Sequence, residues 1–580
     1  MPPFLYGKSM AISFANPFLL TLAARRFHGR ERAKSRAAAI ILAVAGFLVL
    51  SRPTQSGELS TGRDGEAGSG LKTNLCAFAT TSAAYPGAMK KSEVVMRSMI
   101  PRPSNPRDPH DTLAAIRGFH VTRLEWIYGL TPEFVKKAKD LGVSVSGATS
   151  CNTALGITNS PAMAQQFGIL DLNLHSIAAP WMRKWNPPGI WLCINNPTVR
   201  ERSLAQIEQQ YDLGLRDLQR DDPQDNQAAL SWGGCFCPHC MAGFRDYLRT
   251  NCPPDELRAL GVDNVEAFDY RQYLLDHHAP VGDPFRTYDG GRLKELFGAF
   301  QLQATLAFHA WWRAELNRHA GHYVPVSCNN NSLLFTDTFA PFDFWIGELF
   351  VRNNKPEFFF QLEQTVTKLG KTQTLTMPEA RDMPYTPAWI RHIRQAIGAA
   401  YATGLHIEAP WDAYIPGQPT ARFFGEPKDF ADLFAMVHAS ANVLDGYEGV
   451  AATGMNLQDA RWNASNLPVS VLPAAAPVSV FVRAKPGRPD APVVIHLINW
   501  SDSPEPCRLA LRAEMMFAGR PFQAVLLSPV PYQQAAHEAA FASKDYSKLV
   551  QRTVLGAGEL SSLAVPALYP WGIVVLEPLK

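Results

Sequence analysis

Between residues 112 and 409, short apolar runs alternate with longer stretches in which apolar side chains recur every three or four positions. The apolar runs cover 120–127, 142–149, 189–195, 214–221, 322–328, 342–349, 372–379 and 404–410. Amphipathic stretches such as 131–141, 199–213 and 388–402 separate most of them, and each predicts a helix. Eight strands that alternate with helices predict a parallel sheet closed into a (β/α)8 TIM barrel. An open doubly wound sheet is the alternative, but no glycine-rich phosphate loop follows the first run.

After residue 450 the pattern changes to short β-like runs separated by proline and glycine turns. Runs such as "PVSVFV", "PVVIHLINW" and "WGIVVLEP" predict an antiparallel β-sandwich at the C-terminal end of the chain. The amphipathic stretch 429–448 is predicted to be the last barrel helix. We therefore expect a catalytic barrel over 71–448 and a β-sandwich domain over 449–580.

The N-terminal part of the chain has a different composition. A basic block at 25–36 precedes fourteen apolar residues at 37–50, the order of charged and apolar regions in a secretory signal. The apolar segment is shorter than the ~20 residues that a spanning helix needs. A signal peptide or membrane anchor over 1–50 and a flexible linker over 51–70 are the predictions, with a buried helix as the alternative. We expect an exported protein that is periplasmic, anchored to the inner membrane through 37–50, or secreted.

Composition narrows the class of function. The chain has 580 residues, 46% of them hydrophobic, and a net charge of +3, so it is expected to be globular, with two or more domains. No run of Lys and Arg is mixed with aromatic residues, which argues against nucleic acid as a partner. The 13 Trp and 32 Phe residues suit a carbohydrate-binding cleft, where aromatic rings cover the apolar face of a sugar.

Polar side chains gather at the predicted strand ends, where TIM-barrel enzymes place their chemistry. The acids there are Asp221, Asp222, Glu348, Glu379, Glu408 and Asp412. The other candidates, which we expect to bind sugar hydroxyls or rings, are Asn195, Asn196, Asn329, Asn330, Trp126 and Trp411. A single acid at a strand end is often a helix cap, but several on one rim point to glycoside hydrolysis, which uses paired carboxylates. A hard cation held by Asp222, Glu348 and Glu379 is the alternative. Neither a G-x-S-x-G nor an H-E-x-x-H motif is present.

A tight cysteine cluster follows the Asp221–Asp222 pair. Cys235, Cys237 and Cys240 form C-x-C-x-x-C, and a thiolate zinc site needs a fourth ligand. His239 lies beside Cys240 and is poorly placed for the same metal, so Cys193 is the better candidate. Disulfides are the alternative in an exported protein. We predict a structural zinc ion and no organic cofactor.

The stretches "WLCINNPTVRE" and "CFCPHCMAGFRDYL" resemble segments of family-42 beta-galactosidases, a family of TIM-barrel glycoside hydrolases. In that family four cysteines at these positions hold a structural zinc, which implies Cys193, Cys235, Cys237 and Cys240 here. The stretch "TLTMPEARD" resembles the seventh-strand segment of the family and implies that Glu379 is the nucleophile. The resemblance covers roughly 190–415. It fails at the acid/base, because the family has Asn-Glu where this chain has Asp221 and Asp222, so beta-galactosidase activity does not transfer.

The stretch "FDFWIGELF" supplies Glu348 on the sixth strand and resembles dextranase-like and alpha-galactosidase-like barrels, which place an Asp nucleophile on strand four and the acid on strand six. This second resemblance assigns the roles differently. On the family-42 pattern Asp222 protonates the leaving oxygen and Glu379 attacks; on the second pattern Asp222 attacks and Glu348 protonates. Both place Asp222 at the centre of a glycoside hydrolase that acts on an oligo- or polysaccharide. Three alternatives stay open: a transglycosylase in polysaccharide metabolism, a non-catalytic carbohydrate-binding protein on a degenerate barrel, and a metal-dependent hydrolase.

Overall fold

The structure is a computed structural model. It describes residues 74–81, 85, 87–98, 100–102, 110–151, 161–183, 188–215, 217–330, 333, 335–376, 386–415, 418–423 and 425–579, with the backbone alone at 161, 412–415 and 418–423. The predicted signal or anchor segment, the linker and Glu379 lie outside these residues. Within them, none of the helices combines the length and the apolar character needed to cross a membrane.

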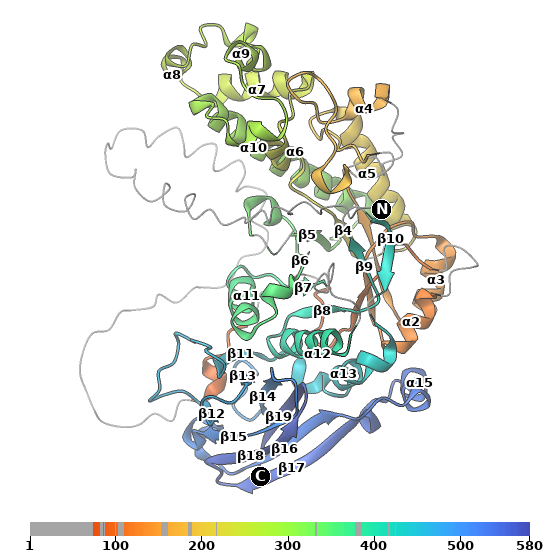
Figure 1. The fold of residues 1–580 in the computed structure, drawn as a ribbon, viewed down its shortest axis with the longest axis vertical. Coiled ribbons are helices and arrows are strands. Elements are labelled where there is room, and N and C mark those ends of the chain that lie inside the picture. The colour runs from red at the N-terminus through yellow and green to blue at the C-terminus, as the bar shows by residue number, and fades with distance from the viewer. Residues whose placement is uncertain are drawn as a thin grey trace, which may run out of the picture. The chain divides into compact units, whose positions relative to one another are not determined.

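Eight parallel strands close into a barrel in chain order, with β1 hydrogen-bonded to both β2 and β8 (Figure 1). The strands are β1 (Val95–Arg97), β2 (Arg123–Ile127), β3 (Ser144–Thr149), β4 (Asp217–Arg220), β5 (Val326–Asn329), β6 (Phe344–Gly347), β7 (Gln373–Leu375) and β8 (His406–Ala409). The closing register pairs Val95 with Glu408, and this closure confirms the predicted TIM barrel and excludes the open sheet.

One predicted strand is wrong and one barrel strand was missed. The apolar run 189–195 forms only isolated bridges, Gly168 with Leu192 and Ala178 with Ile190, and it contributes no strand to the barrel. Its apolar residues are buried around Cys193 in the loop that precedes α5, and an apolar run reports burial rather than pairing. The missed strand is β1, which has only three residues and is too short to show a pattern.

The helices that follow the barrel strands are α2 (Thr112–Gly118), α3 (Pro132–Asp140), α5 (Pro197–Asp212), α10 (Gly291–Ala320), α11 (Pro356–Lys368), α12 (Pro387–Ala402) and α13 (Pro427–Ala439). Proline at the first turn of α3, α5, α11, α12 and α13 suits helix starts, because its missing N–H would have no partner there. α4 (Pro161–Phe167) lies between β3 and α5.

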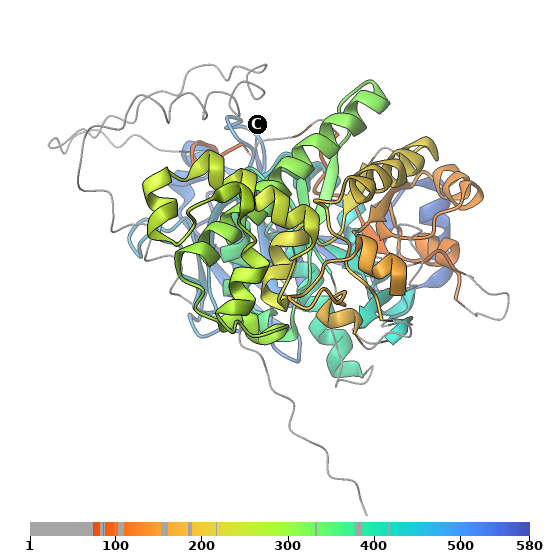
Figure 2. The same ribbon diagram turned by 90° about the horizontal axis from the view of Figure 1, so that it is seen from above.

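A long excursion separates β4 from β5 (Figures 1 and 2). It contains α6 (Asp225–Ala229), α7 (Pro238–Asn251), α8 (Pro254–Ala259), α9 (Tyr270–Asp276) and the 30-residue helix α10. Aromatic rings from α7 and α10 pack together, with Phe244 and Phe297 5.0 Å apart between ring centroids. These rings belong to the same apolar core as the residues between the barrel strands and their helices, so the excursion is packed onto the barrel.

The C-terminal region is a β-sandwich, as predicted. One sheet has the order β11-β13-β14-β19-β16-β17 and the other β12-β15-β18, and the pairings in both are antiparallel. The strands are β11 (Glu448–Thr453), β12 (Val469–Leu472), β13 (Val478–Ala484), β14 (Val493–Asn499), β15 (Glu505–Leu511), β16 (Phe522–Pro529), β17 (Val550–Gly558), β18 (Ser562–Leu568) and β19 (Trp571–Pro578). Val471, Leu509 and Leu563 from the smaller sheet share one apolar core with Val480, Ile495 and Val574 from the larger.

The barrel and the sandwich are in direct contact. Gly398 of α12 has no room for a side chain, because an added Cβ would lie 2.8 Å from Cβ of Trp571 in β19. Between β16 and β17 the short helix α15 (Gln534–Ser543) lies next to α2 and α13 of the barrel, where Nε2 of His120 is 2.7 Å from Nδ1 of His537. Close packing and this buried histidine pair therefore join the two domains.

Candidate active site

The end of β4 is held from outside the barrel by a buried ion pair. Nη2 of Arg220 donates to Oδ1 of Asp225 over 2.5 Å, and both side chains are fully buried. Nε2 of His309, on α10, is 2.7 Å from the carbonyl oxygen of Pro223. Asp222 and Asp225 both have positive φ, 47° and 42°, a conformation that Asp tolerates better than most residues. These contacts fix a tight turn between β4 and α6.

Asp221 points into the barrel mouth among hydrogen-bond donors. Its Oδ1 accepts a hydrogen bond from Nδ2 of Asn329 over 3.0 Å, and its Oδ2 accepts one from the hydroxyl of Tyr128. The indole of Trp126 lies next to the same carboxylate. Burial raises the pKa of Asp221, and the hydrogen bonds from Tyr128 and Asn329, together with the neighbouring indole of Trp126, act in the opposite direction by favouring the ionised form. Asp221 is therefore held firmly in one orientation.

Asn329 connects Asp221 to Glu348. Its Nδ2 lies 3.0 Å from Oδ1 of Asp221 and 3.4 Å from Oε1 of Glu348, so these two oxygens are at most about 6.4 Å apart. The three residues come from the ends of β4, β5 and β6, strands that are neighbours in the barrel. The structure thus brings together two acids that are 127 positions apart in the sequence.

Asp222 is the acid most strongly displaced from its ordinary protonation behaviour. Burial raises its pKa well above the usual range, and the negative charges of Asp221, Glu348 and Asp225 raise it further. Arg220 opposes this effect but is already paired with Asp225. A carboxyl group whose pKa is raised in this way holds its proton to higher pH than an exposed aspartate, which suits a proton donor.

Arg97 and Glu408 form a charged pair on the side of the rim opposite to β4. Nε of Arg97, at the end of β1, lies 3.7 Å from Oε2 of Glu408 at the end of β8, and both side chains are buried. The guanidinium carbon of Arg97 is 4.7 Å from the ring centroid of Trp126. Because Trp126 also contacts Asp221, one indole ring separates Arg97 from the acids of β4.

Several predicted sugar ligands have other partners in the structure. Nδ2 of Asn195 is 3.3 Å from Sγ of Cys240, so this residue lies at the cysteine cluster. Asn196 caps α5 by accepting a hydrogen bond from the backbone N–H of Thr198. Asn330 is fully buried and exchanges two side-chain hydrogen bonds with Gln373, of 2.9 and 3.1 Å.

The residues predicted after β7 and β8 are placed only in part. Trp411 is 8% exposed and packs edge-on against Phe119 and His110, so most of its ring is unavailable to a sugar. Asp412 begins β9 (Asp412–Ile415), which pairs with β10 (Gln418–Phe423), and only its backbone is described. Glu379 lies outside the described residues, so its predicted role is untested.

Sequence reasoning missed Tyr128 and Arg97. Tyr128 directly follows β2, and a tyrosine just past a strand end is a detectable signal. Arg97 lies on the three-residue strand that the apolar pattern did not reveal, so its position on the rim was hidden. Both residues are now placed beside Asp221 through direct contact or through Trp126.

The four predicted cysteine ligands converge in one buried cluster. The sulfurs of Cys193, Cys235, Cys237 and Cys240 all lie within 4.8 Å of one another. Sγ of Cys193 is 3.6 Å from that of Cys237 and 3.5 Å from that of Cys240. A tetrahedral zinc with Zn–S bonds of about 2.3 Å spaces its sulfurs by about 3.8 Å. All nine cysteines of the chain are free thiols, so the disulfide alternative finds no support.

N–H groups surround this cluster, as expected around thiolates. Nδ2 of Asn226 is 3.2 Å from Sγ of Cys193 and 3.4 Å from Sγ of Cys240, and the backbone N–H of Leu170 points at Sγ of Cys235. Such donors offset the negative charge that four thiolates bring to a metal site. The donor set and its spacing therefore fit a structural metal.

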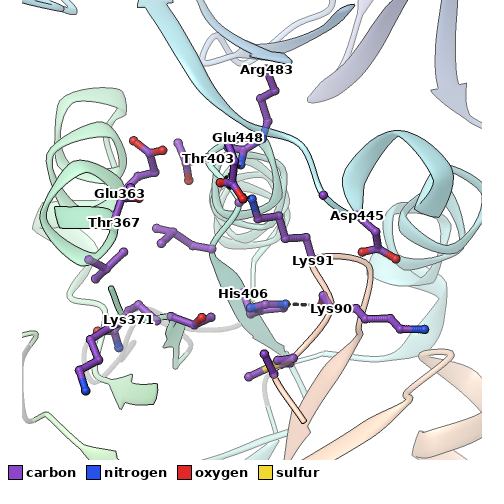
Figure 3. A pocket seen from close by; sticks show the side chains of 18 residues that line it. Lys90, Lys91, Glu363, Thr367, Lys371, Thr403, His406, Asp445, Glu448 and Arg483 are labelled. Atoms are coloured by element: carbon purple, nitrogen blue, oxygen red, sulfur yellow. Dashed lines mark hydrogen bonds and ion pairs between the residues drawn. The ribbon is translucent and has the colours of Figure 1, made fainter. Parts of the chain in front are cut away.

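A cavity of about 240 Å³ lies at the other end of the barrel, at the first residues of β7 and β8 (Figure 3). Its central charges already have partners, because Nζ of Lys91 donates to Oε2 of Glu448 over 2.6 Å and to the carbonyl of Tyr447. Arg483 also donates to that carbonyl. The cavity lies where the barrel meets β11 and β13, away from the acids of the rim.

Comparison with known proteins identifies no family for the chain. No protein-family model matches it, and neither does any curated protein sequence. Solved structures align over most of its length at low identity. A maltogenic alpha-amylase from Thermotoga neapolitana is 8% identical, with 84% of this chain and 99% of that chain covered and a TM-score of 0.43.

Two further alignments have similar values. A cycloisomaltooligosaccharide glucanotransferase from Paenibacillus sp., in complex with cycloisomaltoheptaose, is 9% identical over 86% of this chain and 87% of that chain, with a TM-score of 0.46. An alpha-amylase from H. orenii is 10% identical over 85% and 100%, with a TM-score of 0.43. At this level of similarity, the fold assignment rests on the strand order of the barrel itself.

Proposed function

We propose that the protein is a glycoside hydrolase that acts on an oligo- or polysaccharide. The observation that carries the proposal is the cluster of Asp221, Asp222 and Glu348 at the C-terminal rim of a TIM barrel, with Asn329 between two of them. Glycosidic bonds are cleaved between an acid that keeps its proton and a second acid that is ionised. The raised pKa of Asp222 supports the first role.

In this proposal Asp222 donates its proton to the leaving oxygen as the bond from that oxygen to the sugar carbon breaks. Glu348 carries the negative charge that stabilises the positive charge developing on the sugar ring, and a water molecule completes the hydrolysis by bonding to that sugar carbon and giving its proton to an ionised carboxylate of the pair. The assignment combines the donor role of Asp222 from the family-42 pattern with the β6 acid of the second pattern. Glu379 stays a candidate for the same position as Glu348.

Asp221 and Asn329 have supporting roles. The carboxylate of Asp221 accepts hydrogen bonds from Tyr128 and Asn329 and has the indole of Trp126 beside it, which leaves little freedom for it to move. Its charge, next to that of Glu348, raises the pKa of Asp222. Asn329 orients both acids, since one nitrogen contacts each of them.

The cysteine cluster is proposed to hold one structural zinc ion. Cys193, Cys235, Cys237 and Cys240 would be the four ligands, which leaves no open position for substrate. When bound, the metal would stabilise the loop after β4 by joining it to the segment before α5. The residues of the chain carry out the chemistry at the rim.

Amide variants of the acids test this function. Wild-type protein is screened for release of reducing ends from a panel of polysaccharides and 4-nitrophenyl glycosides. Asp222→Asn and Glu348→Gln are expected to lower kcat by about 10²- to 10⁴-fold, as loss of an acid or base does, while sugar binding measured by saturation-transfer NMR is kept. Asp263→Asn, at an exposed acid far from the rim in sequence, is the matched control and should be fully active.

Three outcomes contradict parts of the proposal. A wild-type protein that binds sugars but cleaves none is a binding protein. Full activity of Glu348→Gln with loss in Glu379→Gln assigns the partner role to Glu379. Activity that disappears with a chelator while the fold persists indicates a metal-dependent hydrolase instead.

Export is also part of the proposal and rests on the basic and apolar segments at 25–36 and 37–50. Cell fractionation of a tagged protein tests it, with Lys substitutions within 37–50 as the comparison. Retention of the wild type in the cytosol would contradict export.

A further inference from the structure

Arg97 is a buried cation at the barrel rim. It is 4% exposed, and it ends β1, the strand that closes the barrel against β8. Its guanidinium lies over the ring of Trp126, 4.7 Å from the centroid, and that ring is a neighbour of Asp221. Arg97 is therefore fixed on a rigid aromatic platform next to the proposed catalytic acids.

The guanidinium of Arg97 has no hydrogen bond with any residue that the structure describes. Its one ionic contact there is with Glu408, at 3.7 Å, which is too long for a hydrogen bond, and its Nε is buried without an acceptor. An arginine carries five N–H donors, and a donor left unmet away from water, as that of Nε is here, is costly. An unmatched donor group at the mouth of a binding site calls for an acceptor on the ligand.

The surrounding charges determine what kind of acceptor fits. Glu408 faces Arg97 across 3.7 Å, and three more acids, Asp221, Asp222 and Glu348, stand on the same rim. A ligand carboxylate, sulfate or phosphate would bring another negative charge to this group. Neutral hydroxyl oxygens avoid that repulsion, and two adjacent hydroxyls match the parallel N–H groups of a guanidinium fork.

We propose that Arg97 is a substrate-binding residue that selects neutral sugars by donating hydrogen bonds to two adjacent hydroxyls of the sugar ring held between Asp222 and Glu348. The inference rests on the proposed function. It adds the class of substrate, neutral sugars, and the residue that recognises it, Arg97. The ring of Trp126 keeps the guanidinium of Arg97 in place by stacking against it, and Glu408 places a negative charge beside it. Arg97 takes no part in proton transfer.

A double-mutant cycle tests this contact by changing Arg97 in the protein and a hydroxyl group in the substrate, separately and together. The parent is a neutral 4-nitrophenyl hexoside that wild-type protein cleaves, and its analogues are the monodeoxy versions of the same sugar. Arg97→Met is expected to lower kcat/KM for the parent by about 10- to 100-fold, the effect of losing charge-assisted hydrogen bonds. Removing one of two adjacent hydroxyls should cost wild type a similar factor but cost Arg97→Met little more, because the partner is already gone.

Two further variants separate the contact from folding. Arg97→Lys keeps the positive charge opposite Glu408 but lacks the fork, so it should discriminate poorly between the parent and the deoxy sugars even where it folds as well as wild type. Arg488→Met, at an exposed arginine of the sandwich, should behave as wild type. Thermal melting of all variants shows whether each one folds.

The results distinguish this inference from the proposed function. Cleavage of hexosides with unchanged deoxy discrimination in Arg97→Lys and Arg97→Met overturns the inference and leaves the hydrolase intact. A wild-type preference for 4-nitrophenyl glucuronide over the hexosides overturns the assignment to neutral sugars. If wild type cleaves no glycoside and Asp222→Asn binds no monosaccharide by saturation-transfer NMR, the proposed function itself fails.

Discussion

The side-chain amide of Asn226 donates a hydrogen bond to the sulfur of Cys193 across 3.2 Å, only four positions after Asp222. The same nitrogen is 3.4 Å from Sγ of Cys240, and the carbonyl oxygen of that amide accepts the backbone N–H of Ile194. Asn226 is fully buried. The turn that carries the proposed proton donor and the cysteine cluster are therefore joined through one side chain.

This contact predicts how metal and stability are linked. Metal-replete protein should contain about one zinc per chain by elemental analysis, and removal of the metal should lower Tm. Asn226→Ala should release zinc faster to a chromogenic chelator and lose about 10- to 100-fold in zinc affinity, as substitutions around metal ligands do. Asn264→Ala, whose side chain caps a short exposed helical turn, is the comparison for loss of an asparagine elsewhere. Metal-free protein with an unchanged Tm would refute the structural zinc.

Asn329 is predicted to act by orientation. Asn329→Ala removes the nitrogen that contacts both Asp221 and Glu348, so the two carboxylates lose the donor that orients both of them. We expect kcat to fall by about 10- to 100-fold with a smaller change in KM, because misplaced groups cost more in the transition state than in binding. Steady-state kinetics on a cleaved glycoside measures this split, and an equal rise in KM with kcat unchanged would indicate a plain binding role.

The protonation of Asp222 predicts the alkaline side of the pH profile. Burial and nearby negative charges raise its pKa, so activity should decline as the pH rises through that pKa and the proton is lost, at a higher pH than for an exposed aspartate. Neutralising Glu348 removes one of the charges that raise this pKa. NMR titration of carboxyl-labelled aspartate in Glu348→Gln should therefore show Asp222 titrating at lower pH than in wild type. A titration unchanged by the substitution would show that the two acids are not coupled.

The histidine pair between the domains predicts sensitivity to acid. Burial first, and then the nearby charges on His537 and His438, lower the pKa of His120 from 6.5 to about 3. A depressed histidine pKa contributes stability that is present above pH 6.5 and is lost as the pH falls toward 3. The free energy of unfolding by urea should thus decrease over this interval, with His406, whose pKa is lowered to about 4, adding to the slope.

Substitution of His120 measures how much this residue contributes to the pH dependence of the free energy of unfolding. His120→Gln removes one group that takes up a proton on unfolding, so stability should depend less steeply on pH between 6.5 and 4 than in wild type. His277→Gln, at an exposed histidine, should leave the slope unchanged. Identical slopes in all three proteins would show that folding does not lower the pKa of His120.

Seven of the eight predicted runs became barrel strands because most strands that are buried on both faces contain several apolar residues, although β4 also buries Gln219 and Arg220. The exception, 189–195, shows the limit of that signal, since its apolar side chains pack around Cys193 instead of pairing with a strand. The four cysteines were predictable because ligand type and short spacing are local properties of the chain. Cys193 lies far from the other three in the sequence; it was proposed because the run lacks a fourth ligand, and the resemblance implies the same residue.

The pattern of apolar and polar residues did not predict which side chains contact one another across the barrel rim. Asn195 and Asn196 follow an apolar run just as Asn329 does, yet only Asn329 contacts the acids, while the other two serve the cysteine cluster and the start of α5. The difference depends on which strand is a neighbour of which. That information exists only once the barrel is closed.

By itself, the sequence determined the barrel, the sandwich and the four cysteines, because apolar periodicity, turn residues and ligand spacing act over a few residues. Only the tertiary structure decided that Glu348 meets Asp221 through Asn329, that Arg97 lies one indole ring away, and that Asn226 joins the turn after β4 to the cysteines. Those contacts join residues far apart in the chain. Their energies depend on burial and on neighbouring charges, which no single stretch of sequence contains.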